Sequence, residues 1–196
     1  NNSLSQVIRI LESVSKVSDY SLNWSKSTVL SFNCSLENSL DLQMQSGNIK
    51  YLGITVSSKL TDLLKLNHTT LLNRIEEDLK RWKSLPITLM GRVASIKMMV
   101  LPRNNYLFSM IPNKPSSDWF KSLDSAISEF LWKDKPPRIS LNTIQKTKDE
   151  GGLDLPNFHN YYRLQYISKW IKNSHLDETW LDIEQEMCNN IMISDL

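Results

Sequence analysis

The sequence predicts an α+β fold that is mostly α-helical, in which a small piece with a helix and a β-hairpin precedes a helical bundle. Three observations support this prediction. Apolar residues recur at helical spacing near the start, alternate with polar residues around 40–56, and return to helical spacing from about residue 66. Prolines interrupt the later helical region, most clearly at Pro136-Pro137. We therefore expect a small αβ piece over 1–57 followed by a helical piece over 58–196, with a break in the chain at Pro136-Pro137.

The first piece has one predicted helix and several short strands. Five apolar residues share a face and predict a helix over 3–17: Leu4, Val7, Ile8, Leu11 and Val14. The segment Thr28–Phe32 is typical of a short strand. Apolar runs at 40–45 and 49–56 flank Gly47-Asn48, and this arrangement predicts a β-hairpin that turns there.

Two helices are predicted next. The first has Leu71, Leu72, Ile75, Leu79 and Trp82 on one face and ends before Pro86. The second has Leu89, Val93, Ile96 and Val100 on its face. We expect Pro102 to kink this second helix, because proline lacks an N–H and its ring clashes with the preceding turn.

Three further helices are predicted after residue 115. Ser116 or Ser117 can cap a helix whose inner face is Trp119, Phe120, Leu123, Ile127, Phe130 and Leu131. A basic stretch from Arg138 to Lys148 follows the proline pair, and helices are predicted around 158–172 and 176–190. The aromatic stripe Phe158, Tyr162, Tyr166 and Trp170 resembles a ladder for stacking bases, but such spacing is more typical of a core.

The bulk composition excludes several classes of protein. No run of 18 apolar residues is present, so we expect no contact with a membrane. The start lacks Met and any leader, so we expect an intracellular piece of a longer protein, from the cytoplasm or nucleus. Cys34 and Cys188 are far apart and have no zinc-like spacing to the three histidines, which favours reduced, unliganded thiols.

The positive charge is concentrated in the middle of the chain. Residues 50–150 contain seventeen basic and ten acidic groups, whereas 1–49 contain three and four, and 151–196 contain three and seven. A basic region is what contact with a phosphate backbone requires. Charge alone, however, favours a solvated surface of mixed sign over nucleic-acid binding.

No constellation of catalytic residues is visible. The chain has no Gly-x-Ser-x-Gly, Walker, Cys-x-x-Cys or His-Glu-x-x-His motif and no adjacent pair of aspartates. Its densest acidic cluster, Glu76-Glu77-Asp78, is expected on the solvated side of a helix. We therefore expect this chain to hold no metal and no other cofactor.

Residues suited to binding are more numerous. Lys80-Arg81-Trp82-Lys83 groups three cations around one aromatic ring, a combination that can hold phosphates and stack on a base. The spacing favours a core position for Trp82 with its cationic neighbours reaching solvent. Arg92 and Arg103 are eleven residues apart and share a face if the helix continues past Pro102, so both are candidates for phosphate contact.

Four blocks, taken in order, resemble the reverse transcriptase of non-LTR, long interspersed element retrotransposons over roughly 3–172. Leu22–Ser27 resembles the motif D loop, and Ile49–Ile54 resembles motif E, the primer grip hairpin. Ile75–Pro86, with Gly91-Arg92, Ile96–Met98 and Leu101-Pro102, resembles the thumb. Phe130–Trp132, Arg138-Ile139 and Gly151-Gly152-Leu153-x-Leu155-Pro156-x-Phe158 resemble the segment after the thumb.

The resemblance implies roles for individual residues. Lys26 matches the motif D lysine, a possible general acid for the leaving pyrophosphate, although a surface lysine after a turn is the favoured interpretation here. Tyr51, Leu52 and Gly53 would place the primer end, where the missing side chain of Gly53 would permit close approach. The remaining candidates for contact with the primer–template duplex are Lys80, Arg81, Arg92, Lys97, Arg103 and Arg138.

The resemblance also defines what this chain lacks. The family's Asp-Asp motif, which holds Mg²⁺ in the full enzyme, would lie just before the helix over 3–17. We therefore expect a palm-derived piece over 1–57, a thumb-like segment over 58–135 and the start of the next segment over 136–196. Its partners would be the primer–template duplex and the rest of the polymerase, and it would not polymerise DNA alone. A helical module that binds nucleic acid or protein without enzymatic activity is the alternative.

Overall fold

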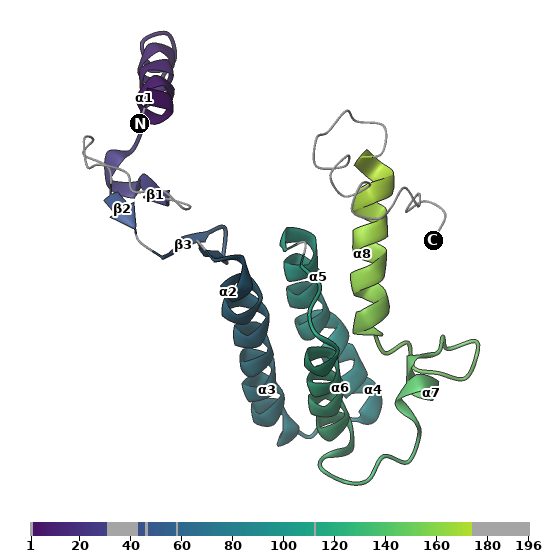
Figure 1. Ribbon diagram of the computed structural model, residues 1–196. Helices are drawn as coiled ribbons and strands as arrows, with labels where there is room; N and C mark the ends of the chain where they lie inside the picture. The colour runs from purple at the N-terminus through teal and green to yellow at the C-terminus, as the bar shows by residue number, and fades with distance from the viewer. Residues whose placement is uncertain (1, 31–42, 46, 58, 112, 174–196) are drawn as a thin grey trace. The chain divides into compact units, whose positions relative to one another are not determined.

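The structure is a computed structural model that describes residues 2–30, 43–45, 47–57, 59–111 and 113–173 (Figure 1). The chain divides into two compact units, Asn1–Leu63 and Leu64–Leu196. Helices predominate, and the strands form two small two-stranded sheets in the first unit. The prediction of a mostly helical α+β fold is confirmed.

The first unit combines the helix α1 and the short helix α2 with short strands. Its elements are α1 (Asn2–Ser15), the 3-10 turn η1 (Trp24–Lys26), β1 (Thr28–Leu30), β2 (Gln43–Gln45), β3 (Asn48–Tyr51), β4 (Ile54–Ser57) and α2 (Leu60–Leu64). β1 pairs with β2 in parallel, and β3 pairs with β4 in an antiparallel hairpin. On the predicted face of α1, Ile8 is buried, whereas Val7 and Val14 remain exposed.

The position predicted for the hairpin turn is wrong. The chain reverses at Leu52-Gly53, where Tyr51 is opposite Ile54, and β2 pairs with β1 rather than with β3. Leu52 and Gly53 have φ values of 47° and 83°, the two consecutive positive angles that a type I′ turn requires. By residue type, Gly47-Asn48 is a stronger turn signal than Leu52-Gly53, because leucine rarely adopts a positive φ.

The second unit is a helical bundle. Its elements are η2 (Lys65–Thr69), α3 (Thr70–Lys83), α4 (Leu89–Ser95), η3 (Ile96–Val100), α5 (Leu101–Met110), α6 (Ser117–Trp132), α7 (Leu141–Gln145) and α8 (Phe158–Asn173). Helices α3 and α4 both pack against α6, and α5 packs against α8 (Figure 1). Segments η2 and η3 are π-helical turns.

The core of the bundle is made by the faces that helical spacing predicted. Leu72, Ile75 and Leu79 of α3 are buried, as are Val93, Ile96 and Val100 of the following helix. All six residues predicted for the inner face of α6 are buried, and Ser116 caps that helix by accepting a hydrogen bond from the Trp119 N–H. Phe158 and Tyr162 join the same cluster, so the core interpretation of the aromatic stripe is confirmed for these two residues.

Pro102 does not break the second helix of the bundle. The chain stays helical from Leu89 to Met110, with the π-helical turn η3 directly before α5. Pro102 then occupies the first turn of α5, where a helix tolerates a residue without an N–H. The helical pitch therefore changes locally just before the proline.

The segment after α7 folds back onto that short helix, which the sequence did not predict. The N–H groups of Leu153 and Leu155 both donate to the Ile144 carbonyl, and the Gly152 N–H donates to the Thr147 carbonyl. A Cβ at Gly152 would overlap the Lys146 carbonyl, so this position cannot accept a side chain without rearrangement. Each glycine of the pair therefore has its own physical explanation. Gly152 lies too close to the Lys146 carbonyl for a side chain, and Gly151 adopts a φ of 80° in the turn.

Several predictions concern residues outside those that the structure describes. These are Cys34, Cys188, His175, the helix over 176–190, and parts of the strands predicted over 28–32 and 40–45. The side chain of Trp170 is likewise outside them. None of the described helices is long and apolar enough to span a membrane.

Candidate nucleic-acid interface

The tip of the β3–β4 hairpin presents large apolar side chains to solvent. Tyr51 is 62% exposed and Leu52 is 65% exposed. A Cβ at Gly53 would meet no atom of the chain within 4 Å, so close approach of the primer end at this glycine stays a prediction. Its positive φ is the reason for a glycine that the structure supports, because L-residues with a side chain rarely adopt it.

Lys26 lies in the same unit, at the end of the η1 turn. The Asn23 side chain accepts a hydrogen bond from the Lys26 N–H at 3.2 Å and another from the Ser25 hydroxyl at 2.8 Å. The polar turn therefore fixes the backbone at Lys26, while its side chain is exposed. This geometry agrees with a surface lysine after a turn and leaves its catalytic role a prediction.

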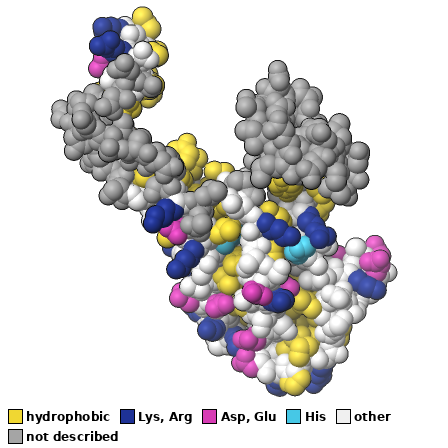
Figure 2. Space-filling view, in the orientation of Figure 1, with side chains coloured by type: hydrophobic (Ala, Val, Ile, Leu, Met, Phe, Trp, Pro, Cys, Tyr) yellow, Lys and Arg dark blue, Asp and Glu magenta, His cyan; other side chains and the backbone are white. Residues whose placement is uncertain are grey.

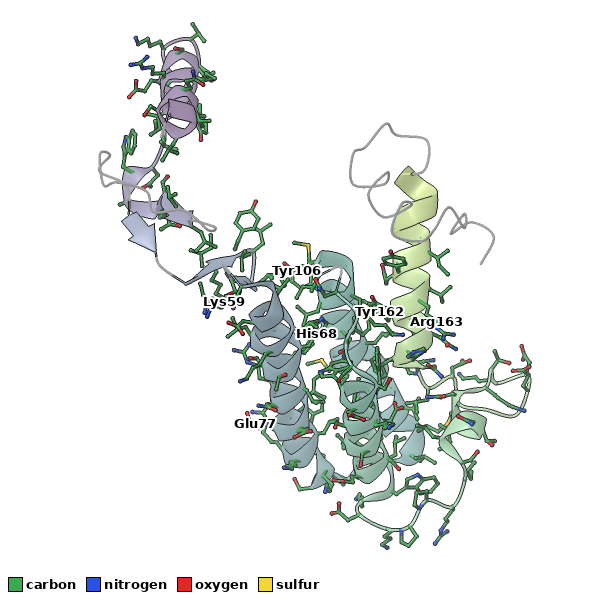
Figure 3. All side chains as sticks on the ribbon, in the orientation of Figure 1. Lys59, His68, Glu77, Tyr106, Tyr162 and Arg163 are labelled. Atoms are coloured by element: carbon green, nitrogen blue, oxygen red, sulfur yellow. The ribbon has the colours of Figure 1, made fainter. Side chains whose placement is uncertain are left out.

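Two predicted phosphate-binding arginines share one carboxylate in the second unit. Arg103 Nη1 lies 2.6 Å from Asp78 Oδ2, and Arg81 Nη2 lies 2.5 Å from Asp78 Oδ1. Only 18% of the Asp78 side chain is exposed, so its predicted place on a solvated face is wrong, whereas Glu77 does point outward (Figure 3). Asp78 brings Arg81 of α3 and Arg103 of α5 together and neutralises part of their charge.

Two other candidate cations, Lys97 and Lys80, also lie near carboxylates. Lys97 Nζ lies 3.6 Å from Asp154 Oδ2, a loose and exposed pair of small energetic value. Lys80 is exposed and lines a groove of about 290 Å³ between α3 and α6, together with Glu76 and Glu129. Two carboxylates in that groove make it unfavourable for a phosphate. Figure 2 shows basic and acidic side chains interspersed on the visible face of the bundle.

Arg92 is almost entirely buried, although it contributes to the floor of the groove near Trp132 and Arg138. Only 2% of it is exposed, and its guanidinium donates hydrogen bonds to the carbonyls of Phe130, Ile87 and Lys83. Its charge also lies 5.1 Å from the centre of the Phe130 ring. The expectation that Arg92 contacts phosphate is corrected, because its donors stabilise the junction of α3, α4 and α6.

Arg138 lies at a second groove, which sequence reasoning missed. This groove has a volume of about 250 Å³ and is formed by the segment before α4, the end of α6 and the chain that follows α6. Trp132, Lys133 and Lys135 line it with Arg138. The missed signal was the run Trp132–Arg138, in which three cations follow one aromatic residue within six positions.

A histidine whose imidazole ring has no hydrogen-bond partner lies inside the bundle. His68, in the π-helical turn η2, is labelled in Figure 3. Its ring stacks on that of Phe108 with the centroids 6.1 Å apart and lies edge-on to that of Trp119 at 5.5 Å. Neither ring nitrogen has a hydrogen-bond partner, and burial lowers the pKa of His68 from 6.5 to about 4. The Trp119 indole N–H donates to the His68 carbonyl at 2.9 Å, which ties this turn to α6.

The acidic side chains within the described ranges do not form a magnesium site. Among the described residues, no group of three or more His, Cys, Asp or Glu side chains is arranged to hold a metal ion. Both oxygens of Asp78 are bound by arginines, so the Glu76–Asp78 cluster cannot offer its most buried carboxylate. The sequence matches no protein-family model.

Proposed function

We propose that this chain holds nucleic acid as the end of the palm, the thumb and the following segment of a retrotransposon reverse transcriptase. In this proposal its ligand is the RNA/DNA primer–template duplex and its larger partner is the remainder of the polymerase. The observation that supports it best is the hairpin at Ile49–Ile54. The block that resembles motif E forms a β-hairpin with a two-residue turn, and Tyr51 and Leu52 are exposed at its tip.

Surface cations of the second unit also support this proposal. Lys80, Arg81 and Arg103 lie on the outside of the bundle, and residues 50–150 have seventeen basic and ten acidic groups, whereas the rest of the chain is net acidic. A helical bundle with scattered surface cations suits recognition of duplex shape and phosphates rather than base sequence. The chain contains no adjacent pair of aspartates, so the proposed role is to hold the duplex rather than to catalyse its extension.

A hairpin-tip variant tests the proposal. The full chain is titrated against a fluorescein-labelled RNA/DNA primer–template at low salt, and anisotropy gives the affinity. We expect Tyr51→Ala to weaken binding about fivefold or more, the range typical of losing one aromatic contact with a base or sugar. Tyr20→Ala is the matched control, because Tyr20 is also an exposed tyrosine of the first unit and lies outside the hairpin.

Two outcomes would contradict the proposal. Equal effects of the two tyrosine variants would remove the hairpin from the interface. Primer extension by this chain alone with Mg²⁺ would contradict the division between holding and catalysis.

The alternative, a protein-interaction module, is favoured by one observation. Met90, Met98, Met99 and Met110 are all exposed along the continuous helix from α4 to α5. Methionine side chains adapt to varied partner surfaces, and exposed apolar groups of this kind often mark an interaction surface. A stable complex with a defined protein, together with no affinity for any nucleic acid, would favour this alternative.

A further inference from the structure

The groove beside the end of α6 combines an apolar floor with a basic rim. Ile87, Leu89 and Leu131 contribute apolar surface, and Trp132 lies beside them. Lys133, Lys135 and Arg138 line the same groove. In Figure 2, hydrophobic and basic side chains lie next to one another at the lower end of the bundle.

The rim has an uncompensated positive charge. Within the part of the chain that the structure describes, no carboxylate lies within salt-bridge distance of Lys133, Lys135 or Arg138. The one acidic residue of this segment, Asp134, has its carboxylate 2.6 Å from Lys83 Nζ on α3. Three cations therefore surround an apolar groove without an internal counter-charge, which is the charge complement of a polyanion.

A role in capping α6 explains only part of this arrangement. Cations near the C-terminus of a helix interact favourably with its dipole, and Lys133 is the C-cap of α6. That effect is confined to the last turn, however, and Lys135 and Arg138 lie beyond it. Interaction with the helix dipole therefore does not account for the positions of Lys135 and Arg138.

The size of the groove limits what can enter it. A volume of about 250 Å³ is below the range of pockets that bury a whole drug-sized ligand, and suits one flat ring system. Trp132 offers an aromatic surface on which a base can stack, and the three cations can bind the adjoining phosphates. A base inside a duplex has both faces stacked on its neighbours, so only an unpaired base can enter such a groove.

We propose that the groove formed by Trp132, Lys133, Lys135 and Arg138 binds an unpaired segment of nucleic acid, with one base against Trp132. The inference rests on the proposed function in that both require nucleic acid. It adds a second, single-strand site in the bundle to the duplex-holding role. No base-specific contact is implied, because stacking accepts any base.

Two oligonucleotide probes test the site in the unaltered full chain. One is a labelled oligothymidylate, and the other has the same length and phosphates but an abasic backbone. We expect the oligothymidylate to bind about fivefold or more tightly, because only its bases can stack. Equal affinities for the two probes would contradict the proposal without any need for a variant.

Variants then locate the site. Trp132→Leu keeps an apolar side chain against the core, and we expect it to abolish the difference between the two probes. The triple variant Lys133→Gln, Lys135→Gln and Arg138→Gln should weaken binding to both probes about tenfold more than the control triple Lys114→Gln, Lys121→Gln and Lys148→Gln. Equal losses from the two triples would show only a general charge effect and would overturn the assignment.

The primer–template duplex separates this inference from the proposed function. If the duplex binds while the two single-stranded probes behave alike, the groove proposal fails and the duplex-holding role stands. If neither single strands nor the duplex bind, both fail. We expect the Trp132→Leu variant to keep the affinity of the parent chain for a blunt-ended duplex, because no unpaired base is present.

Discussion

Arg92 of α4 is bound to the carbonyl of Phe130 in α6 and lies over the ring of the same residue. One arginine thus contacts both the backbone and the side chain of a residue 38 positions away. We predict that Arg92→Met lowers the free energy of unfolding by about 3 kcal/mol, because buried carbonyls lose their donor. Urea denaturation measures this, with the exposed Arg74→Met as control; equal stability of the two variants would contradict the structural role.

The shared carboxylate of Asp78 gives a prediction for binding. Asp78→Asn should release Arg81 and Arg103 for phosphate contact, so affinity for the primer–template should rise and its salt dependence should steepen by up to about 2 in the log–log slope. Asp118→Asn is the matched control, since it removes the same charge from the exposed pair with Lys121. If both variants raise affinity equally, the effect is one of net charge and the two arginines are not specific contacts.

Gly152 gives a prediction for stability. Gly152→Ala should cost about 2 kcal/mol or more, because the new methyl group overlaps the Lys146 carbonyl and displaces the segment that returns to α7. Gly91→Ala is the control, since the nearest atoms to its new Cβ lie at 3.5 and 3.6 Å and alanine favours a helix. The denaturant midpoint should therefore fall for Gly152→Ala and should rise or stay unchanged for Gly91→Ala. Equal decreases in the two midpoints would contradict the close contact at Gly152.

His68 predicts a loss of stability in acid. Its pKa is lowered by burial to about 4 in the folded chain and is near 6.5 when unfolded, so the unfolded state binds the proton first. Above pH 6.5 the neutral imidazole costs no free energy of unfolding. As the pH falls below 6.5 the free energy of unfolding decreases, and the loss reaches ~3 kcal/mol near pH 4, at 1.36 kcal/mol per pKa unit. In His68→Phe this part of the pH dependence should vanish; an identical pH profile in the variant would show that His68 is not the titrating group.

Much of the core was predictable because burial in helices is periodic. The spacing of Ile75, Leu79, Val93 and Ile96 identified their helical faces without any tertiary information, and each is buried. The serine cap at Ser116 was visible for a similar reason, since it depends on residues within one turn.

The features that were missed depend on contacts between distant residues or on rare backbone angles. Arg92 was indistinguishable from a surface arginine, because its partners Lys83 and Phe130 lie on other helices. The hairpin turn was misplaced because Leu52 adopts a positive φ that its residue type disfavours. The groove around Trp132 is formed by residues of α4, α6 and the chain that follows α6, an arrangement that no local pattern predicts.

The most direct test of the account is the affinity of the full chain for an RNA/DNA primer–template as a function of salt. Because the candidate contacts are to phosphates, log affinity should fall linearly with log salt, with a slope of about −0.9 for each phosphate neutralised. We predict binding at micromolar protein in low salt and a steep loss as salt is raised. No binding at micromolar protein in low salt would contradict the proposal that this chain holds a nucleic-acid duplex.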